Sequence, residues 1–222
     1  MKKFLKLTAT AVSLVMALAL MSCDNGNGTT EEEKLNLVGT YSISSIEEKR
    51  VSDSKNLSIV KSMPTSSSFR QVGTNSKTSG DTTSTQEMDM TVTKTSSGYT
   101  FTWTKYTIDG VDATTEQKSK MESKFDNDDT WSDMTKMFSM TITTTEDLTW
   151  SDNENPASSG TYTVDETNSK VTLKTLVSKG TTLDKPEEME CTYSNYGKNL
   201  VVVEDNSSGS NIDKTTINFV RQ

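Results

Sequence analysis

Apolar residues alternate with threonine, serine or lysine through most of this chain, in short runs that are separated by turn residues. In the stretch "GYTFTWT", for example, Tyr99, Phe101 and Trp103 occupy every second position. Strict alternation over four to eight residues is typical of a β-strand with one buried face. About ten such runs follow residue 35, so the pattern predicts an all-β protein.

The connections between these runs are mostly short, as at residues 96–98, 165–169, 195–199 and 206–211. Connections of this length join antiparallel neighbours, because parallel neighbours need a crossover of a dozen or more residues. Sequential hairpins favour a barrel over a two-sheet sandwich, which typically uses Greek-key connections. We therefore predict an antiparallel up-and-down β-barrel of about 8–10 strands over residues 35–222.

Two segments depart from the alternation. Residues 62–86 are rich in serine, threonine and glycine and almost free of apolar residues, which predicts a long mobile loop. Residues 112–136 contain Met121 and Phe125, four positions apart and preceded by good helix formers. This second segment is predicted to be a helical and acidic insertion, with one short helix that ends near Asp126.

The acidic stretch that follows, "DNDDTWSD", raises the question of a calcium site, because hard cations favour clustered carboxylates. An EF-hand loop that started at Asp126 would need glycine at its sixth position and glutamate at its twelfth. Those positions hold Trp131 and Met137. A solvated acidic loop is therefore the prediction, and no metal site is expected.

The first 22 residues are predicted to be a signal peptide, because three lysines precede an apolar run that is too short to span a bilayer. The run ends in Leu20-Met21-Ser22-Cys23, which resembles the bacterial lipobox. The resemblance implies cleavage before Cys23 and attachment of acyl chains, such as palmitate, to its thiol and new amine. Residues 23–34 would then be an acidic tether. This predicts export to a bacterial cell envelope and a lipid anchor in its inner or outer membrane.

Charge and composition exclude several functions. The chain has 23 Lys+Arg and 31 Asp+Glu, and removal of the three signal lysines leaves 20 against 31. A nucleic-acid partner is therefore disfavoured, since phosphate binding needs a basic surface. The chain has no histidine, which removes the commonest metal ligand and general base. Cys191 has no histidine to activate it as a nucleophile, and we expect neither a cofactor nor an enzymatic activity.

A closed barrel pairs its first strand with its last, which brings Tyr41 and Arg221 together near one end. An arginine over an aromatic ring can close such an end by cation–π stacking. Gly39-Thr40-Tyr41 and Arg221 resemble the lipocalin and lipocalin-like families, whose first strand carries Gly-x-Trp and whose last strand carries an arginine that packs on the tryptophan. Here tyrosine replaces tryptophan. A second triplet, Gly160-Thr161-Tyr162, is predicted only to start a strand after a turn.

The apolar side chains that should face the barrel interior suit a small apolar ligand. Seven residues are candidates for lining such a site: Met90, Phe101, Trp103, Met140, Trp150, Tyr162 and Tyr193. The first hypothesis is therefore a lipid-anchored, non-catalytic protein that binds a small apolar or amphipathic ligand in the barrel. The alternative is an interaction or inhibitor protein whose barrel is filled and which works through acidic loops. The sequence leaves the oligomeric state open.

Overall fold

The computed structural model describes residues 34–222, so the expected signal peptide, Cys23 and all but the last residue of the tether lie outside the described part. The first half of that part contains β1 (Gly39–Ser52), β2 (Lys55–Thr65), β3 (Ser68–Ser79), β4 (Thr82–Thr95), β5 (Gly98–Ile108), β6 (Val111–Asp112), α1 (Thr115–Glu122) and α2 (Asp128–Phe138). The second half contains β7 (Thr141–Thr144), β8 (Thr149–Asp152), β9 (Ser159–Asp165), β10 (Lys170–Ser178), β11 (Thr181–Ser194), η1 (Asn195–Gly197), β12 (Asn199–Asp205) and β13 (Ile212–Arg221).

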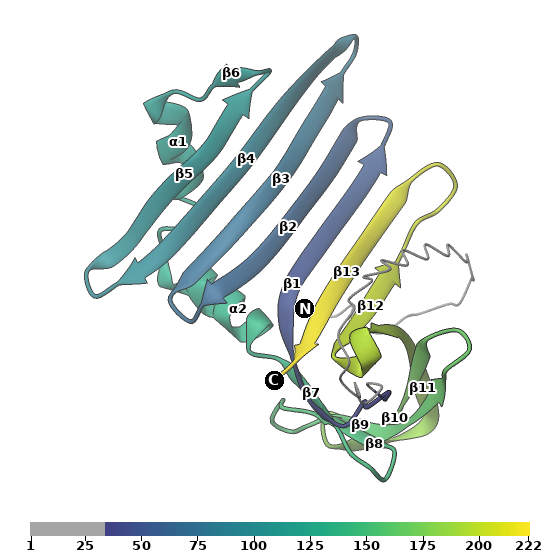
Figure 1. Cartoon of the computed structure of the whole chain (residues 1–222). Helices are drawn as coiled ribbons and strands as arrows, with labels where there is room; N and C mark the ends of the chain where they lie inside the picture. The colour runs from purple at the N-terminus through teal and green to yellow at the C-terminus, as the bar shows by residue number, and fades with distance from the viewer. Residues whose placement is uncertain (1–33) are drawn as a thin grey trace, which may run out of the picture.

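Eight of these strands form a closed barrel. Strands β7 to β13 pair in sequence order, β7 pairs with the start of β1, and β13 returns to pair with β1. Every pairing in this ring is antiparallel. The predicted all-β, antiparallel up-and-down barrel is thus confirmed, and it occupies the lower right of Figure 1.

The remaining strands, β2 to β6, form an open antiparallel sheet that extends from β1, and we call this sheet the wing (Figure 1). Strand β1 belongs to both parts. Its residues 39–42 pair with β7 and its residues 45–52 pair with β2, while β13 pairs along both halves. The register of β1 against β13 shifts between Ile43 and Ser45, which is where the barrel half ends and the wing half begins. A bulge of this kind bends a strand and increases its twist.

The prediction of a mobile loop over residues 62–86 is wrong. The end of β2, all of β3 and the start of β4 cover most of this segment. Threonine has a high β propensity, and the serine and threonine hydroxyls bond across the strands, as between Ser76 and Thr85 and between Thr78 and Thr83. Two apolar residues of the segment contribute to the core, since Phe69 is buried in it and Met63 packs against it, and the polar remainder is held by backbone pairing with the neighbouring strands.

The insertion between β6 and β7 contains two helices where the sequence predicted one. Helix α1 starts with a capping box, in which Thr114 and Gln117 each bond to the other's backbone N–H. The segment predicted to be an acidic loop is instead the start of α2. Asn127 caps this helix by accepting a bond from the backbone N–H of Thr130. Asp128 and Asp129 lie in its first turn, where carboxylates interact favourably with the helix dipole.

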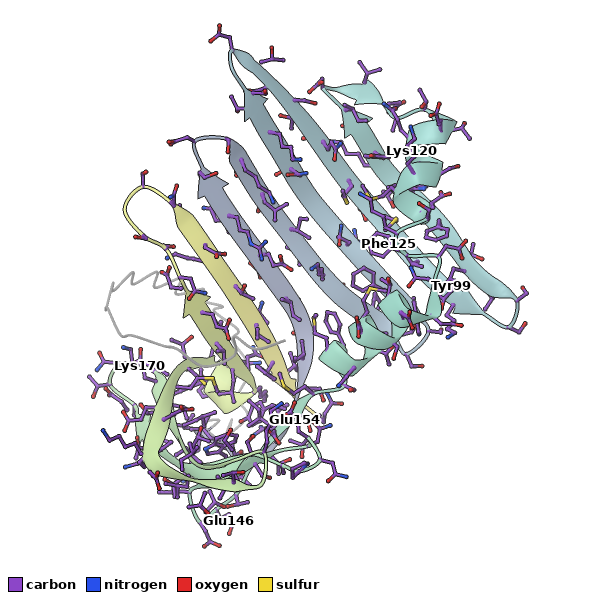
Figure 2. All side chains as sticks on the ribbon, turned by 180° about the vertical axis from the view of Figure 1, so that it is seen from behind. Tyr99, Lys120, Phe125, Glu146, Glu154 and Lys170 are labelled. Atoms are coloured by element: carbon purple, nitrogen blue, oxygen red, sulfur yellow. The ribbon has the colours of Figure 1, made fainter. Side chains whose placement is uncertain are left out.

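Both helices lie on one face of the wing, as Figure 2 shows from behind. The buried side of α2 consists of Trp131, Met134 and Phe138. The ring of Phe138 packs edge-on against Phe69 of β3, with centroids 6.4 Å apart, and Phe125 stacks on Phe69 at 6.0 Å. The residues under α2 therefore belong to the same cluster as the barrel core, whereas Met121 of α1 packs in a second cluster with Met88, Tyr106 and Ala113.

Candidate functional site

Large side chains pack together in the interior of the barrel. Five large residues that reach into it are almost completely inaccessible: Tyr41 (0% exposed), Leu173 (0%), Leu200 (1%), Phe219 (2%) and Tyr162 (3%). A cavity wide enough for a ligand would leave its lining side chains accessible to a water-sized probe. An eight-stranded barrel can be filled by side chains or can hold one small ligand, and burial of the lining residues favours the first. The geometry is therefore that of a packed core.

Four of the seven predicted lining residues lie in the barrel part, and they belong to this core. Trp150 and Tyr162 are buried, and Met140 and Tyr193 pack partly buried against the same cluster. The polar ends of the aromatic side chains have partners: Trp150 Nε1 donates to the carbonyl of Lys174 at 3.4 Å, and the Tyr162 hydroxyl donates to that of Thr145 at 2.9 Å. The indole N–H and the hydroxyl thus both have hydrogen-bond acceptors inside the protein, as is usual for buried tryptophan and tyrosine.

The other three predicted lining residues, Met90, Phe101 and Trp103, do not lie in the barrel. Met90 is on β4 and the two aromatic residues are on β5, all on the helix-covered face of the wing. Trp103 stacks on Tyr106 with a centroid distance of 4.8 Å, and its Nε1 donates to Glu122 of α1 at 2.7 Å. The prediction failed because alternation marks the buried face of a strand equally in a closed barrel and in an open sheet.

The three residues predicted to close the barrel, Gly39, Tyr41 and Arg221, lie close together at one end of it. Tyr41 and Arg221 are direct cross-strand partners. Gly39 has a φ of +147°, and a Cβ there would lie 2.7 Å from Cδ of Arg221, so the arginine stem packs on the space that glycine leaves. The expected cation–π stacking is replaced by hydrogen bonds: Arg221 Nη1 donates to the carbonyls of Asn36 at 2.7 Å and Val38 at 3.4 Å.

The Tyr41 hydroxyl joins three parts of the chain. It can donate to the carbonyl of Leu37 at 2.9 Å or to that of Gly197 in η1 at 2.7 Å. Thr144 of β7 also donates to Leu37. Burial raises the pKa of Tyr41 to about 12, and the charge of Arg221 opposes part of that rise. The neutral hydroxyl therefore works as a structural donor that joins β1 to the segment before it and to η1.

We expect Tyr41→Phe to lower the free energy of unfolding by about 1–3 kcal/mol, because buried carbonyl groups lose their donor. The wild-type protein should also lose stability as the pH rises from 10 to 12, since the unfolded chain gives up the Tyr41 proton first. This alkaline loss should be smaller in the variant. Urea unfolding at pH 7 and pH 11 checks both effects, and an unchanged pH dependence would contradict the role given to the hydroxyl.

The second triplet has a structural requirement that the sequence did not show. A Cβ at Gly160 would lie 1.8 Å from the carbonyl oxygen of Lys174, so β9 and β10 approach too closely for any side chain at this position. The register of the two strands shifts beside this contact, between Thr175 and Val177. Tyr162 follows as a buried core residue, as Tyr41 does in the first triplet. Both glycines thus permit a close approach, although to different neighbours.

The face of the wing opposite the helices, which we call the outer face, is polar and ordered. Arg70 bonds to Asp89 through two hydrogen bonds of 3.0 and 2.8 Å, which hold the pKa of that carboxyl below its usual value. Lys105 pairs with Glu87 at 2.7 Å, and this lowers the pKa of Glu87. Threonine and serine occupy most of the remaining positions of this face.

Further features of the described residues concern metal binding, thiol reactivity, surface shape and membrane spans. No group of three His, Cys, Asp or Glu side chains there could hold a metal ion. Cys191 is 1% exposed, and burial raises the pKa of its thiol to about 12, which keeps it protonated and unreactive. A shallow, open depression lies beside α2, lined in part by Lys94, Trp131 and Lys136. Within residues 34–222, no helix has both the length and the apolar character needed to cross a membrane.

Comparison with known proteins gave no match to a family model, to a curated protein or to a solved structure. The geometry of the barrel and the wing is therefore the basis for a functional proposal.

Proposed function

We propose that this chain is an exported, lipid-anchored protein of a bacterial cell envelope that binds another protein through the outer face of its wing. In this proposal the barrel is a lipocalin-like scaffold that holds no ligand and catalyses no reaction. The observation that carries the proposal is the packed barrel interior, where Tyr41 and Leu173 are 0% exposed. Of the two hypotheses raised by the sequence, the filled barrel favours the interaction protein.

The wing has the dimensions that such a contact needs. Strands β2 to β5 are 11, 12, 14 and 11 residues long. With about 4.8 Å between strands and 3.4 Å per residue, one face of these strands covers about 700–800 Å². A specific protein interface buries about 800 Å² on each partner. The outer face is thus large enough for a complete interface.

The chemistry of the outer face indicates the kind of partner. Its charges are balanced in pairs, as in Arg70 with Asp89, and hydroxyl groups lie between them. Val60, which is 40% exposed, adds apolar area. A mixed surface of this kind suits a folded protein with complementary polar groups, because about one hydrogen bond forms per 100–200 Å² of a typical interface. The acidic chain as a whole disfavours nucleic acid.

The membrane anchor is a separate part of the proposal and rests on the sequence around Cys23. Several acyl chains would hold the protein firmly to a bilayer, since a single chain binds only marginally. The acidic tether would then separate the barrel from the membrane surface. Replacement of Cys23 by alanine should move the exported protein from the membrane fraction to the soluble fraction, and continued membrane association would contradict the anchor.

The interface is tested by placing a photo-crosslinking amino acid at Thr74, on the outer face of β3, in the full chain in its native cells. Thr163, an exposed threonine on β9 of the barrel, is the matched control. We expect a crosslinked product of one defined mass from position 74 and none from position 163. Products of equal yield at both positions, or no product at position 74, would contradict the proposed contact surface.

A further inference from the structure

Strand β5 leaves most of one edge of the wing without a neighbouring strand. Among the described residues, β5 pairs with β4 along its length, whereas β6 pairs only with Thr107 and Ile108. The outer edge of residues 98–103 therefore has no strand beside it. Figure 1 shows this half of β5 at the free margin of the sheet, and Figure 2 shows Tyr99 near the same margin.

This edge lacks the features that keep exposed strands from pairing. Residues 98–104, "GYTFTWT", contain no charge and no proline. Natural edge strands are usually protected by lysine, proline or a bulge, and an uncharged segment with high β propensity is otherwise prone to pair with another strand. The register shift on β5 that places Thr104 as an extra residue comes only after Trp103. The six residues before it form a regular ladder that is open on one side.

The backbone groups that face outward can be assigned from the ladder. Thr95 and Gly98 are paired across a two-residue turn, and the closing pair of such a hairpin is hydrogen-bonded. Antiparallel pairs then alternate, so Thr100 and Thr102 bond to β4, whereas the N–H and C=O groups of Tyr99, Phe101 and Trp103 point away from it. Three residues in alternation thus present free donors and acceptors along this edge.

We propose that two copies of this chain pair through β5, antiparallel and about a two-fold axis at Phe101, which joins their wings into one continuous sheet. The segment is complementary to itself in this arrangement. Tyr99 of one copy lies opposite Trp103 of the other, Thr100 lies opposite Thr102, and Phe101 lies opposite itself. Aromatic–aromatic and threonine–threonine pairs are among the favourable cross-strand combinations, and a two-fold contact requires such a self-complementary surface.

Local charge permits this contact although the whole chain is acidic, with a net charge of −8. The lysines that flank the segment are already paired: Lys94 with Asp128 at 2.9 Å and Lys105 with Glu87 at 2.7 Å. Between them, residues 95–104 carry no charge, so no like charges meet along the paired strands. The outer face of the wing remains exposed in the dimer, so the pairing does not depend on the proposed partner contact.

The test is native mass spectrometry of the full chain, extracted from the membrane in a mild detergent, in three forms. The wild-type chain should be a dimer. Thr100→Lys combined with Thr102→Lys places lysines opposite each other and should raise the dimer dissociation constant about tenfold or more. Thr163→Lys combined with Thr192→Lys adds the same charge at exposed barrel threonines and should leave the dimer intact.

Charge complementation separates edge pairing from misfolding. Chains with Thr100→Glu and Thr102→Glu should dimerise as weakly as the lysine variant when alone, but the two variants should form a mixed dimer when combined. If the charged variants fail to fold, chains with Thr100→Cys and Thr102→Cys should form an interchain disulfide when mixed and mildly oxidised. A monomeric wild type, a lysine variant with the same dimer dissociation constant as the wild type, or a mixture that gives neither a mixed dimer nor a disulfide would overturn the proposal.

Discussion

Replacing Phe219 with alanine is expected to lower the free energy of unfolding by about 3–5 kcal/mol, because the change leaves a cavity in a packed core. Phe219 is 2% exposed and lies opposite Ile43 on one neighbouring strand and Leu200 on the other, both of which are buried. These two residues are held by the strand pairing of the closed barrel, so they cannot collapse far into the space. Urea denaturation monitored by tryptophan fluorescence measures the effect.

Val220→Ala is the matched control, since Val220 is the next residue on β13 and is 39% exposed on the opposite face. Its replacement should change the free energy of unfolding by only about 0.5 kcal/mol, as is usual for surface substitutions. A similarly small effect at Phe219 would mean that its side chain borders free space, which would contradict the filled barrel.

Replacing Gly160 with alanine is expected to lower the free energy of unfolding by about 1–3 kcal/mol or more, because the new methyl group collides with backbone rather than with a flexible side chain. The Cβ would lie 1.8 Å from the Lys174 carbonyl oxygen and 3.1 Å from the backbone nitrogen of Leu176. Strands β9 and β10 would have to separate, and this would disturb the barrel beside Trp150, the cross-strand neighbour of Gly160 on β8. Thermal and urea unfolding both test this expectation.

Gly209→Ala provides the comparison for this second variant. Gly209 has a φ of +60°, and a Cβ there would meet nothing within 4 Å. Alanine should therefore cost only the conformational penalty of a left-handed residue, about 1–2 kcal/mol. If Gly160→Ala is no more destabilising than Gly209→Ala, the close approach of β9 to β10 is not a constraint on the fold.

The barrel could be predicted from the sequence because short connections and a few residues near the strand ends indicate it. The short hairpin connections set antiparallel sequential pairing, and the positions of Gly39, Tyr41 and Arg221 indicated which strands close the ring. Both signals hold in the structure, where Tyr41 and Arg221 are cross-strand partners. The capping of α2 by Asn127 was equally local but was missed, because the surrounding aspartates suggested a solvated loop.

The wing could not be predicted because the difference between barrel and open sheet is not local. Phe101 and Trp103 alternate with threonine in the same way as Tyr162 does, although the first two pack under helices and the third inside the barrel. The two environments arise because β1 is 14 residues long. Its first half pairs with β7 in the barrel, and its second half pairs with β2 in the wing. The bulge between Ile43 and Ser45 that divides the halves has no proline or glycine to mark it.

The central claim, that the barrel is a filled scaffold, is tested most directly by native mass spectrometry of the full chain after export in a bacterial host, with and without added fatty acids. The account predicts the mass of the chain with its covalent lipids, as one copy or as the proposed dimer, and no bound small molecule. A further non-covalent mass, bound in one-to-one ratio, lost on denaturation and reduced by Trp150→Ala, would contradict it and would make the barrel a ligand carrier.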